Sequence, residues 1–170
     1  WSNTFEISMI ASKLAPKVGL DPNEAFTTGV LHNIGELMIH SLVPEQAVEI
    51  TKRIDEGENP LQVQRDVLST DAPELGAKLA NAWKFPPEMA DAIAHVNQPG
   101  KAEVSKKLAC LLYLARDIHK RWDSLPSEKN KVHFLTTHPA AKALSIAPST
   151  VVVIDEVRGK GSELAFELFS

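Results

Sequence analysis

Residues 21–40 read DPNEAFTTGVLHNIGELMIH and carry the clearest secondary-structure signal in the chain. Asp21 can cap a helix, Pro22 suits the first helical position, and Glu24 can reach back as in a capping box. Apolar side chains then recur at helical spacing, at Phe26, Val30, Ile34, Leu37 and Met38. The segment therefore predicts one amphipathic helix that runs to about residue 40.

Helix signals extend from this segment in both directions. Caps, prolines and apolar periodicity predict further helices at about residues 5–18, 44–56, 60–68, 72–83, 87–95, 104–122, 131–135, 139–146 and 162–169. Residues 151–154 (VVVI) are β-branched and favour a strand, but Ser149 and Thr150 could cap a helix there. Because one isolated strand would have no partner, we predict a helix. No repeat, low-complexity tract or linker divides residues 1–170, so we expect one all-α domain.

Composition excludes several classes of protein. The chain has 170 residues, 44% of them apolar and 24% charged, which suits one soluble globular domain. A net charge of -4, a pI of about 5.9 and the lack of a basic stripe argue against nucleic acid as a main partner. No apolar stretch approaches the roughly 20 residues that cross a bilayer, and no signal peptide opens the chain. We therefore expect a cytoplasmic protein with no membrane partner.

Several aromatic and reactive side chains are predicted to be structural. Trp1, Trp83 and Trp122 lie on apolar faces or at helix ends, which favours the core over a ligand platform. Cys110 stands in an apolar run and is predicted to be a buried hydrophobic residue. His119 and Asp123 have the i, i+4 spacing of a surface pair.

Residues 31–35, LHNIG, contain the sharpest chemical signal. They resemble the Leu-His-Asp-Ile-Gly motif of HD-domain phosphohydrolases, in which the histidine and the aspartate both bind metal. A carboxylate supplies hard anionic oxygen and can bridge two metal ions that are poised for phosphoester hydrolysis. Here Asn33 stands at the aspartate position, and a neutral amide binds a transition metal much more weakly.

A longer set of motifs resembles the HDOD family, a group of HD-related output domains known from bacterial signalling proteins. The matching residues are Trp1, Ser2, Ala11, Leu14, Ala25, Phe26, residues 28–35, residues 71–83 (DAPELGAKLANAW), Phe85, Pro86, Ala92, Ile93 and Pro99. The resemblance runs from Trp1 to about Trp122 and fades over residues 126–170, where the C-terminal helices match weakly. It implies a multi-helix HD-domain-like bundle, often found beside receiver or cyclic-di-nucleotide domains.

The family normally has an N-terminal helical portion before the matched region, and the resemblance implies that residues 1–170 lack it. The first predicted helix is apolar over a wide arc, and such a helix needs burial on more than one side. Its apolar residues are Phe5, Ile7, Met9, Ile10, Leu14 and Val18. We therefore expect an exposed apolar patch on this helix, through which the chain forms a homodimer, binds a hydrophobic dye, or needs the upstream residues to be soluble.

Most metal-ligand positions of HD enzymes, carried over through the resemblance, hold other residues in this chain. The replaced positions fall on Asn33, Ala72, Val96, Asn97 and Arg116. Only His32 keeps a ligand type, and Arg116 would bring a permanent positive charge towards the site. We therefore predict a degenerate site with no catalytic residue and no cofactor. A re-formed weak metal site would use His32 with His95 or Asp117.

The environment of His32 can also be predicted from helical spacing alone. On a helical wheel, His32 lies opposite the apolar face and shares its own face with Ala25, Thr28, Gly29 and Glu36. Small residues allow a second helix to approach closely, so we predict a buried histidine that hydrogen-bonds a neighbour. Glu36, four residues on, is a plausible partner.

Functions of different classes remain open. The first is a non-catalytic bacterial signal-transduction module that contacts signalling proteins or neighbouring regulatory domains. The alternative is an HD-type metal-dependent phosphohydrolase with an altered site, acting on nucleotides or phosphodiesters and using Mg²⁺, Mn²⁺ or Fe²⁺. The replaced ligands favour the first. A third possibility, a helical nucleic-acid-binding domain, is disfavoured by the pI of about 5.9.

Overall fold

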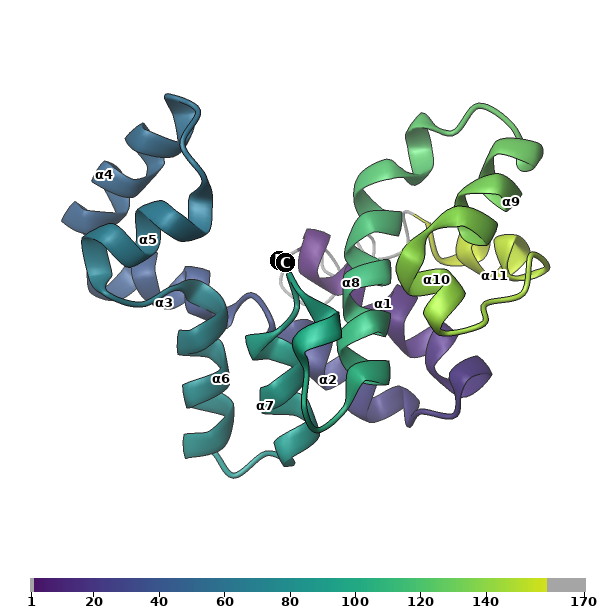
Figure 1. Ribbon diagram of the computed structural model, residues 1–170, viewed down its shortest axis with the longest axis horizontal. Helices are drawn as coiled ribbons and strands as arrows, with labels where there is room; N and C mark the ends of the chain where they lie inside the picture. Colours follow the sequence, from purple (N-terminus) through teal and green to yellow (C-terminus); the bar gives the residue numbers. More distant parts are fainter. Residues whose placement is uncertain (1, 159–170) are drawn as a thin grey trace.

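The chain folds into α-helices and short 3-10 helices throughout residues 2–158, the part that the computed structural model describes (Figure 1). No strand occurs in this range, which confirms the all-α prediction. The α-helices are α1 (Ser2–Leu14), α2 (Pro22–Leu31), α3 (Ile34–Leu42), α4 (Pro44–Asp55), α5 (Pro60–Leu68), α6 (Ala72–Ala82), α7 (Pro87–Ala94), α8 (Lys106–Arg121), α9 (Glu128–Thr137), α10 (Pro139–Ala143) and α11 (Thr150–Val157). None of them combines the length and the continuous apolar character that a bilayer span requires.

Most of the local predictions hold. The side chain of Asp21 accepts hydrogen bonds from the backbone at the start of α2, and Asp71 does the same at the start of α6. Residues 151–154 belong to α11, so the prediction of a helix rather than a strand is confirmed. The helix expected at residues 162–169 lies outside the described residues.

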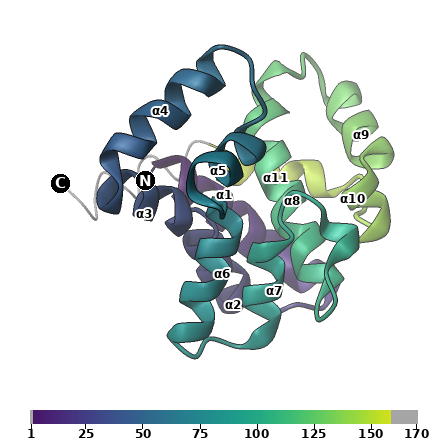
Figure 2. The same ribbon diagram turned by 60° about the vertical axis from the view of Figure 1, so that its left-hand side comes forward.

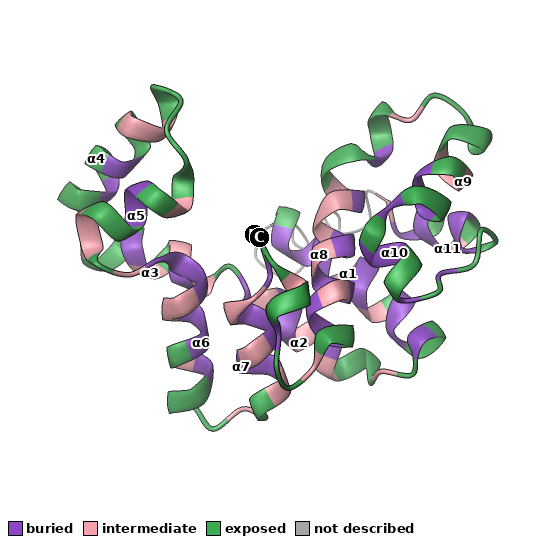
Figure 3. Cartoon of the chain, in the orientation of Figure 1, coloured by how far each residue is buried: buried purple, intermediate pink, exposed green. Residues whose placement is uncertain are grey.

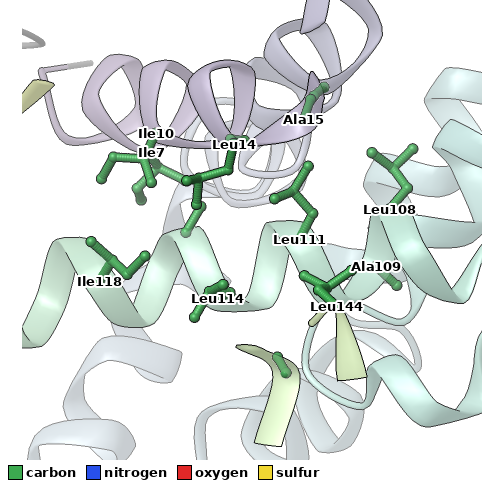
Figure 4. Packing of buried hydrophobic residues seen from close by; sticks show 14 of the residues in the cluster. Ile7, Ile10, Leu14, Ala15, Leu108, Ala109, Leu111, Leu114, Ile118 and Leu144 are labelled. Carbon is green, nitrogen blue, oxygen red and sulfur yellow. The ribbon is translucent and has the colours of Figure 1, made fainter. Parts of the chain in front are cut away.

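The main hydrophobic core forms around α8, which contacts α1, α7 and α10. Leu111 and Ile118 of α8 are fully buried and face Ile10 and Leu14 of α1 (Figure 4). Burying a large aliphatic side chain contributes roughly 1.5–3 kcal/mol, so this pairing is a major source of stability. Trp122 follows α8 and is 1% exposed, which confirms the prediction that it is a core residue.

Helix α1 is covered by its own chain, so the prediction of an exposed apolar patch on it was wrong. Phe5 and Ile7 are buried, and Ile10 and Leu14 have no exposed surface. Helices α2, α8 and α11 all contact α1 and together cover it from more than one side. The wide apolar arc did indicate burial on several sides, but the other described helices supply it. The expected dimer through this patch loses its physical basis.

Helices α3, α4 and α5 form a smaller lobe with a core of its own (Figures 1 and 2). That core consists of Ile39, Ala47, Ile50, Val63 and Ala72. The lobe joins the rest of the molecule through the packing of α3 against α6. Much of the outer surface of α4 and α5 is exposed (Figure 3), and it includes Val48 at 71% exposure.

The single helix predicted for residues 22–40 is two helices, and this prediction was wrong. Helix α2 ends at Leu31 and α3 begins at Ile34, with a turn at His32 and Asn33. The turn redirects the chain so that α3 reaches α6, where an added Cβ on Gly35 would meet the backbone of Ala72. Apolar spacing alone does not reveal such a turn, because the period continues across it.

Other side-chain predictions were wrong at the surface. Trp83 is 55% exposed just after α6 and contacts Phe85 edge-on, so it is not a core residue. Cys110 is only half-buried against the main core. Asp123 pairs with Arg158 at 2.6 Å instead of pairing with the histidine four residues before it. Trp1 lies outside the described residues.

We predict that Gly35→Ala lowers the free energy of unfolding by about 1–3 kcal/mol, because the new methyl group would overlap the carbonyl of Ala72. Gly→Ala in a helix otherwise stabilises by about 0.5–1 kcal/mol, so the sign of the change reports the contact. Urea denaturation measures the effect. Gly100→Ala is the matched control, since nothing lies near its Cβ position, and it should stay within about 0.5 kcal/mol of wild type. Equal stability of both variants would contradict the close approach.

Candidate functional site

A pocket of about 360 Å³ lies where the turn between α2 and α3 meets α5, α6, α7 and α8. Its lining includes all six positions that the resemblance assigned to the degenerate site: His32, Asn33, Ala72, Val96, Asn97 and Arg116. Glu36, Asn59, Pro60, Leu61 and Pro73 complete the lining. Residues from five separate segments of the sequence therefore meet around one small space.

His32 is a buried, neutral imidazole at the C-terminal end of α2. Its Nδ1 donates a hydrogen bond to the carbonyl oxygen of Gly29, so the proton of the neutral ring is on Nδ1 and Nε2 is an acceptor. Burial lowers its pKa to about 4, the bond to Gly29 opposes this shift, and the nearby charge of Arg116 adds to it. The prediction of a buried, hydrogen-bonded histidine is confirmed, but its partner is a carbonyl and not Glu36.

Glu36 is instead held by Gln64, a residue that the sequence did not single out as functional. The Gln64 side chain is 2% exposed, and its Nε2 donates to Glu36 Oε1 at 2.8 Å. Its Oε1 accepts from the backbone N–H of Ala72 at 2.8 Å. One amide therefore ties α3, α5 and α6 together beside the pocket. A glutamine on the otherwise apolar face of the 60–68 helix was the available signal.

Arg116 contributes the positive charge of the pocket. Its guanidinium is half-buried, and Nη1 donates to Asn97 Oδ1 at 3.0 Å. Burial lowers the pKa of Arg116, while the fields of Asp117, Tyr113 and Glu36 act in the opposite direction. An arginine stays protonated even so, because its ordinary pKa lies far above neutral. The pocket therefore holds a fixed cation beside the neutral imidazole of His32.

The two auxiliary metal-ligand candidates lie elsewhere. His95 Nδ1 donates to the carbonyl of Asp91 at 2.9 Å, and its side chain lines a different pocket. Asp117 accepts a 2.7 Å hydrogen bond from His138 Nε2, while His138 Nδ1 accepts from the N–H of Ala140. The structure thus does not bring His95 and Asp117 together with His32 in one pocket.

The donor set of the pocket does not fit a metal centre of the HD type. No group of three or more His, Cys, Asp or Glu side chains is close enough to hold a metal ion anywhere in residues 2–158. His32 has the orientation that metal-bound histidines use, with one nitrogen on a carbonyl and the other free. The other polar groups of the lining, however, are three neutral asparagine amides, one carboxylate (Glu36) that Gln64 already binds, and the cation of Arg116, which repels a second cation. We derive no metal-dependent step from these residues.

Sequence comparison supplies the family. A profile of the HDOD domain matches residues 1–99, which is more than half of the chain. The chain belongs to the HDOD family. An uncharacterized protein of Treponema pallidum (strain Nichols) is 30% identical over 112 residues. That match covers 64% of this chain and 22% of the relative, so this HDOD chain spans about a fifth of the relative's length.

Solved structures share the fold. A Shewanella amazonensis SB2B protein that carries the provisional name of a phosphohydrolase superposes with a TM-score of 0.91 at 33% identity, over 99% of this chain and 62% of its own. An HDOD domain protein of unknown function from Geobacter sulfurreducens superposes with a TM-score of 0.75 at 19% identity, over 96% of this chain and 61% of its own. The response regulator MmoQ from Methylococcus capsulatus superposes with a TM-score of 0.65 at 23% identity, over 86% of this chain and 60% of its own. The predicted HD-like helical fold is confirmed.

We predict that His32→Leu lowers the free energy of unfolding at pH 7 by roughly 1–3 kcal/mol, since the Gly29 carbonyl loses a buried donor. The difference in the free energy of unfolding between wild type and His32→Leu should become smaller as the pH falls from 6.5 towards 4. The folded imidazole has a pKa of about 4 against an ordinary 6.5, so the unfolded state binds more protons in this window. Wild type therefore loses stability on acidification that the leucine variant cannot lose.

Urea midpoints at pH 7 and pH 5 measure both effects. His133→Leu on α9 is the control, because this histidine is exposed, and it should change stability at pH 7 by less than about 0.5 kcal/mol. An unchanged midpoint for His32→Leu at pH 7, or a gap that widens at pH 5, would show that the imidazole is not buried in its neutral form.

Proposed function

We propose that this HDOD domain is a non-catalytic output module of bacterial signal transduction that acts through contacts with other proteins. The observation that supports this most directly is the guanidinium of Arg116 in the pocket where HD enzymes hold their metals. A permanent cation at this place opposes the binding of a divalent ion. It also replaces a ligand, because the resemblance assigns a carboxylate to this position.

The surface of the smaller lobe supports a role in protein contacts. Leu42 at the end of α3 and Val48 on α4 are 70% and 71% exposed, and Leu37 of α3 is 44% exposed. A contiguous apolar surface marks a site that binds another protein, and these exposed side chains are the residues of the lobe that such a site would use. Signalling proteins or adjoining regulatory domains are the partners that we propose, with a second copy of the chain as a further candidate.

The alternative is a metal-dependent phosphohydrolase with an altered site. Two observations favour it: the provisional name of the Shewanella protein, and the free Nε2 of His32. Against it stands the chemistry of the donor set, in which Asn33 and Asn97 are amides and Arg116 is a cation. Under this alternative the metal would be Mg²⁺, Mn²⁺ or Fe²⁺, whereas our proposal needs no cofactor.

We predict no turnover of nucleotides or of a chromogenic phosphodiester when Mn²⁺, Mg²⁺ or Fe²⁺ is added to metal-stripped protein. The reason is that the pocket lining has a single carboxylate, that of Glu36, and that residues 2–158 contain no group of three or more His, Cys, Asp or Glu side chains that could hold a metal ion and activate its bound water. Product release is followed spectroscopically, and His32→Ala is the control for contaminating activity. Metal-dependent turnover that His32→Ala abolishes would overturn the proposal and establish the phosphohydrolase.

We also predict that Asn33→Asp alone creates no tight metal site, because Arg116 still repels the ion. The double variant Asn33→Asp/Arg116→Asp removes that charge and adds a second carboxylate, so its Mn²⁺ affinity should exceed that of the single variant. Calorimetric titration with Mn²⁺ compares the two proteins. Stoichiometric tight binding by the single variant would mean that further ligands reach the pocket and that Arg116 is not the obstacle.

A further inference from the structure

Arg116 is a half-buried cation with few partners. Its Nη1 bond to the neutral amide of Asn97 is the hydrogen bond that the guanidinium makes within residues 2–158, and it forms no ion pair with a carboxylate there. A guanidinium has five N–H donors, so most of them are left without a protein acceptor. Removing such a group from water is costly, and an anion in the pocket would compensate for it.

Two pockets meet at this guanidinium. The pocket of about 360 Å³ described above and a neighbouring pocket of about 530 Å³ share Asn97 and Arg116 in their linings. Both volumes lie within the roughly 300–1,000 Å³ that small-molecule sites occupy. A side chain that is half-buried between two such spaces is recessed from the flat surface, which favours a small ligand over the side chain of a partner protein.

The neutral groups around Arg116 suit an oxyanion. The side chain of Asn33 makes no hydrogen bond at the start of α3, so its N–H₂ group can donate to a ligand. His32 is neutral, with Nε2 as an acceptor for a protonated oxygen. Glu36 is the opposing feature, because its negative charge lies in the same lining, although Gln64 binds one of its oxygens. The balance of charges favours a monoanion over a dianion.

We propose that the pocket of about 360 Å³ binds a small organic anion through the phosphate or carboxylate group of that anion, with Arg116 as the main contact and Asn33 as a second donor. The inference rests on the proposed function, since it requires a pocket without metal. Arg116 offers two parallel N–H donors, an arrangement that matches either kind of oxyanion. Binding would supply the output module with a chemical input, because the ligand would bridge α8 and the turn between α2 and α3.

The test is an NMR titration of the ¹⁵N-labelled protein with inorganic phosphate and, separately, with acetate, at constant ionic strength set by chloride. Metal is removed with a chelating resin, because the carboxylates of dissolved EDTA would compete. We expect a saturable shift of the Arg116 Nε–H signal with a dissociation constant on the order of 1 mM. The anion with the lower dissociation constant, phosphate or acetate, identifies the kind of group by which the natural ligand binds.

Variants distinguish specific binding at Arg116 from the non-specific attraction of anions to surface cations. Arg116→Met should weaken binding at least tenfold, whereas Lys120→Met should leave it unchanged, since Lys120 is an exposed cation of the same helix that lines only the neighbouring pocket. Glu36→Gln should strengthen binding several-fold, because it removes the opposing charge. If Arg116→Met is unfolded by circular dichroism, Glu36→Gln and Arg116→Lys decide the matter, the latter with weaker binding.

The inference is wrong if neither anion gives a saturable shift, if Arg116→Met binds like wild type, or if Lys120→Met loses as much affinity. Such a failure leaves the proposed function intact as long as metal-dependent turnover is also absent. Anion binding that appears only after Mn²⁺ is added would overturn both, because the metal and not Arg116 would then hold the anion.

Discussion

Helix α3 meets α6 at a point where Gly35 lies directly against the backbone of Ala72, with no room for a side chain between them. This contact requires α3 to leave the direction of α2, and the chain turns at His32 and Asn33 to allow it. The turn brings both residues to one rim of the pocket, while the start of α6 brings Ala72 to another. Gln64 secures the same junction, because its amide bonds both α3 and the first N–H of α6.

The charge in the pocket follows from this geometry. Helix α8 is fixed by its buried face against α1, and the position of Arg116 on that helix carries its guanidinium to the pocket and to Asn97. His32 responds to the same surroundings, since burial and the nearby cation both favour its neutral form. The pocket that contains the positions assigned to the HD site is therefore lined by a cation, amides, one neutral imidazole and the carboxylate of Glu36. The proposal that it binds an anion rather than a metal ion rests on this combination.

Local features of the fold were predictable because they depend on neighbouring residues. Asp21 and Asp71 cap helices through bonds to backbone N–H groups two or three residues away. The apolar spacing of α8 likewise predicted a buried face and the burial of Trp122. Trp83 was misassigned for the opposite reason, since apolar spacing does not show whether a distant segment covers a residue, and in the fold Trp83 is 55% exposed.

The amino-acid sequence was sufficient for the helical class, for the HDOD resemblance and for the six positions of the altered site, because caps, periodicity and motif residues are local in the chain. It was not sufficient for the partners of those residues. Glu36 bonds Gln64 and not His32, and Asp117 bonds His138, each across more than 20 positions in the sequence. Such pairs exist because separate helices bury their apolar faces against one another, and the direction each helix then takes sets which polar groups meet.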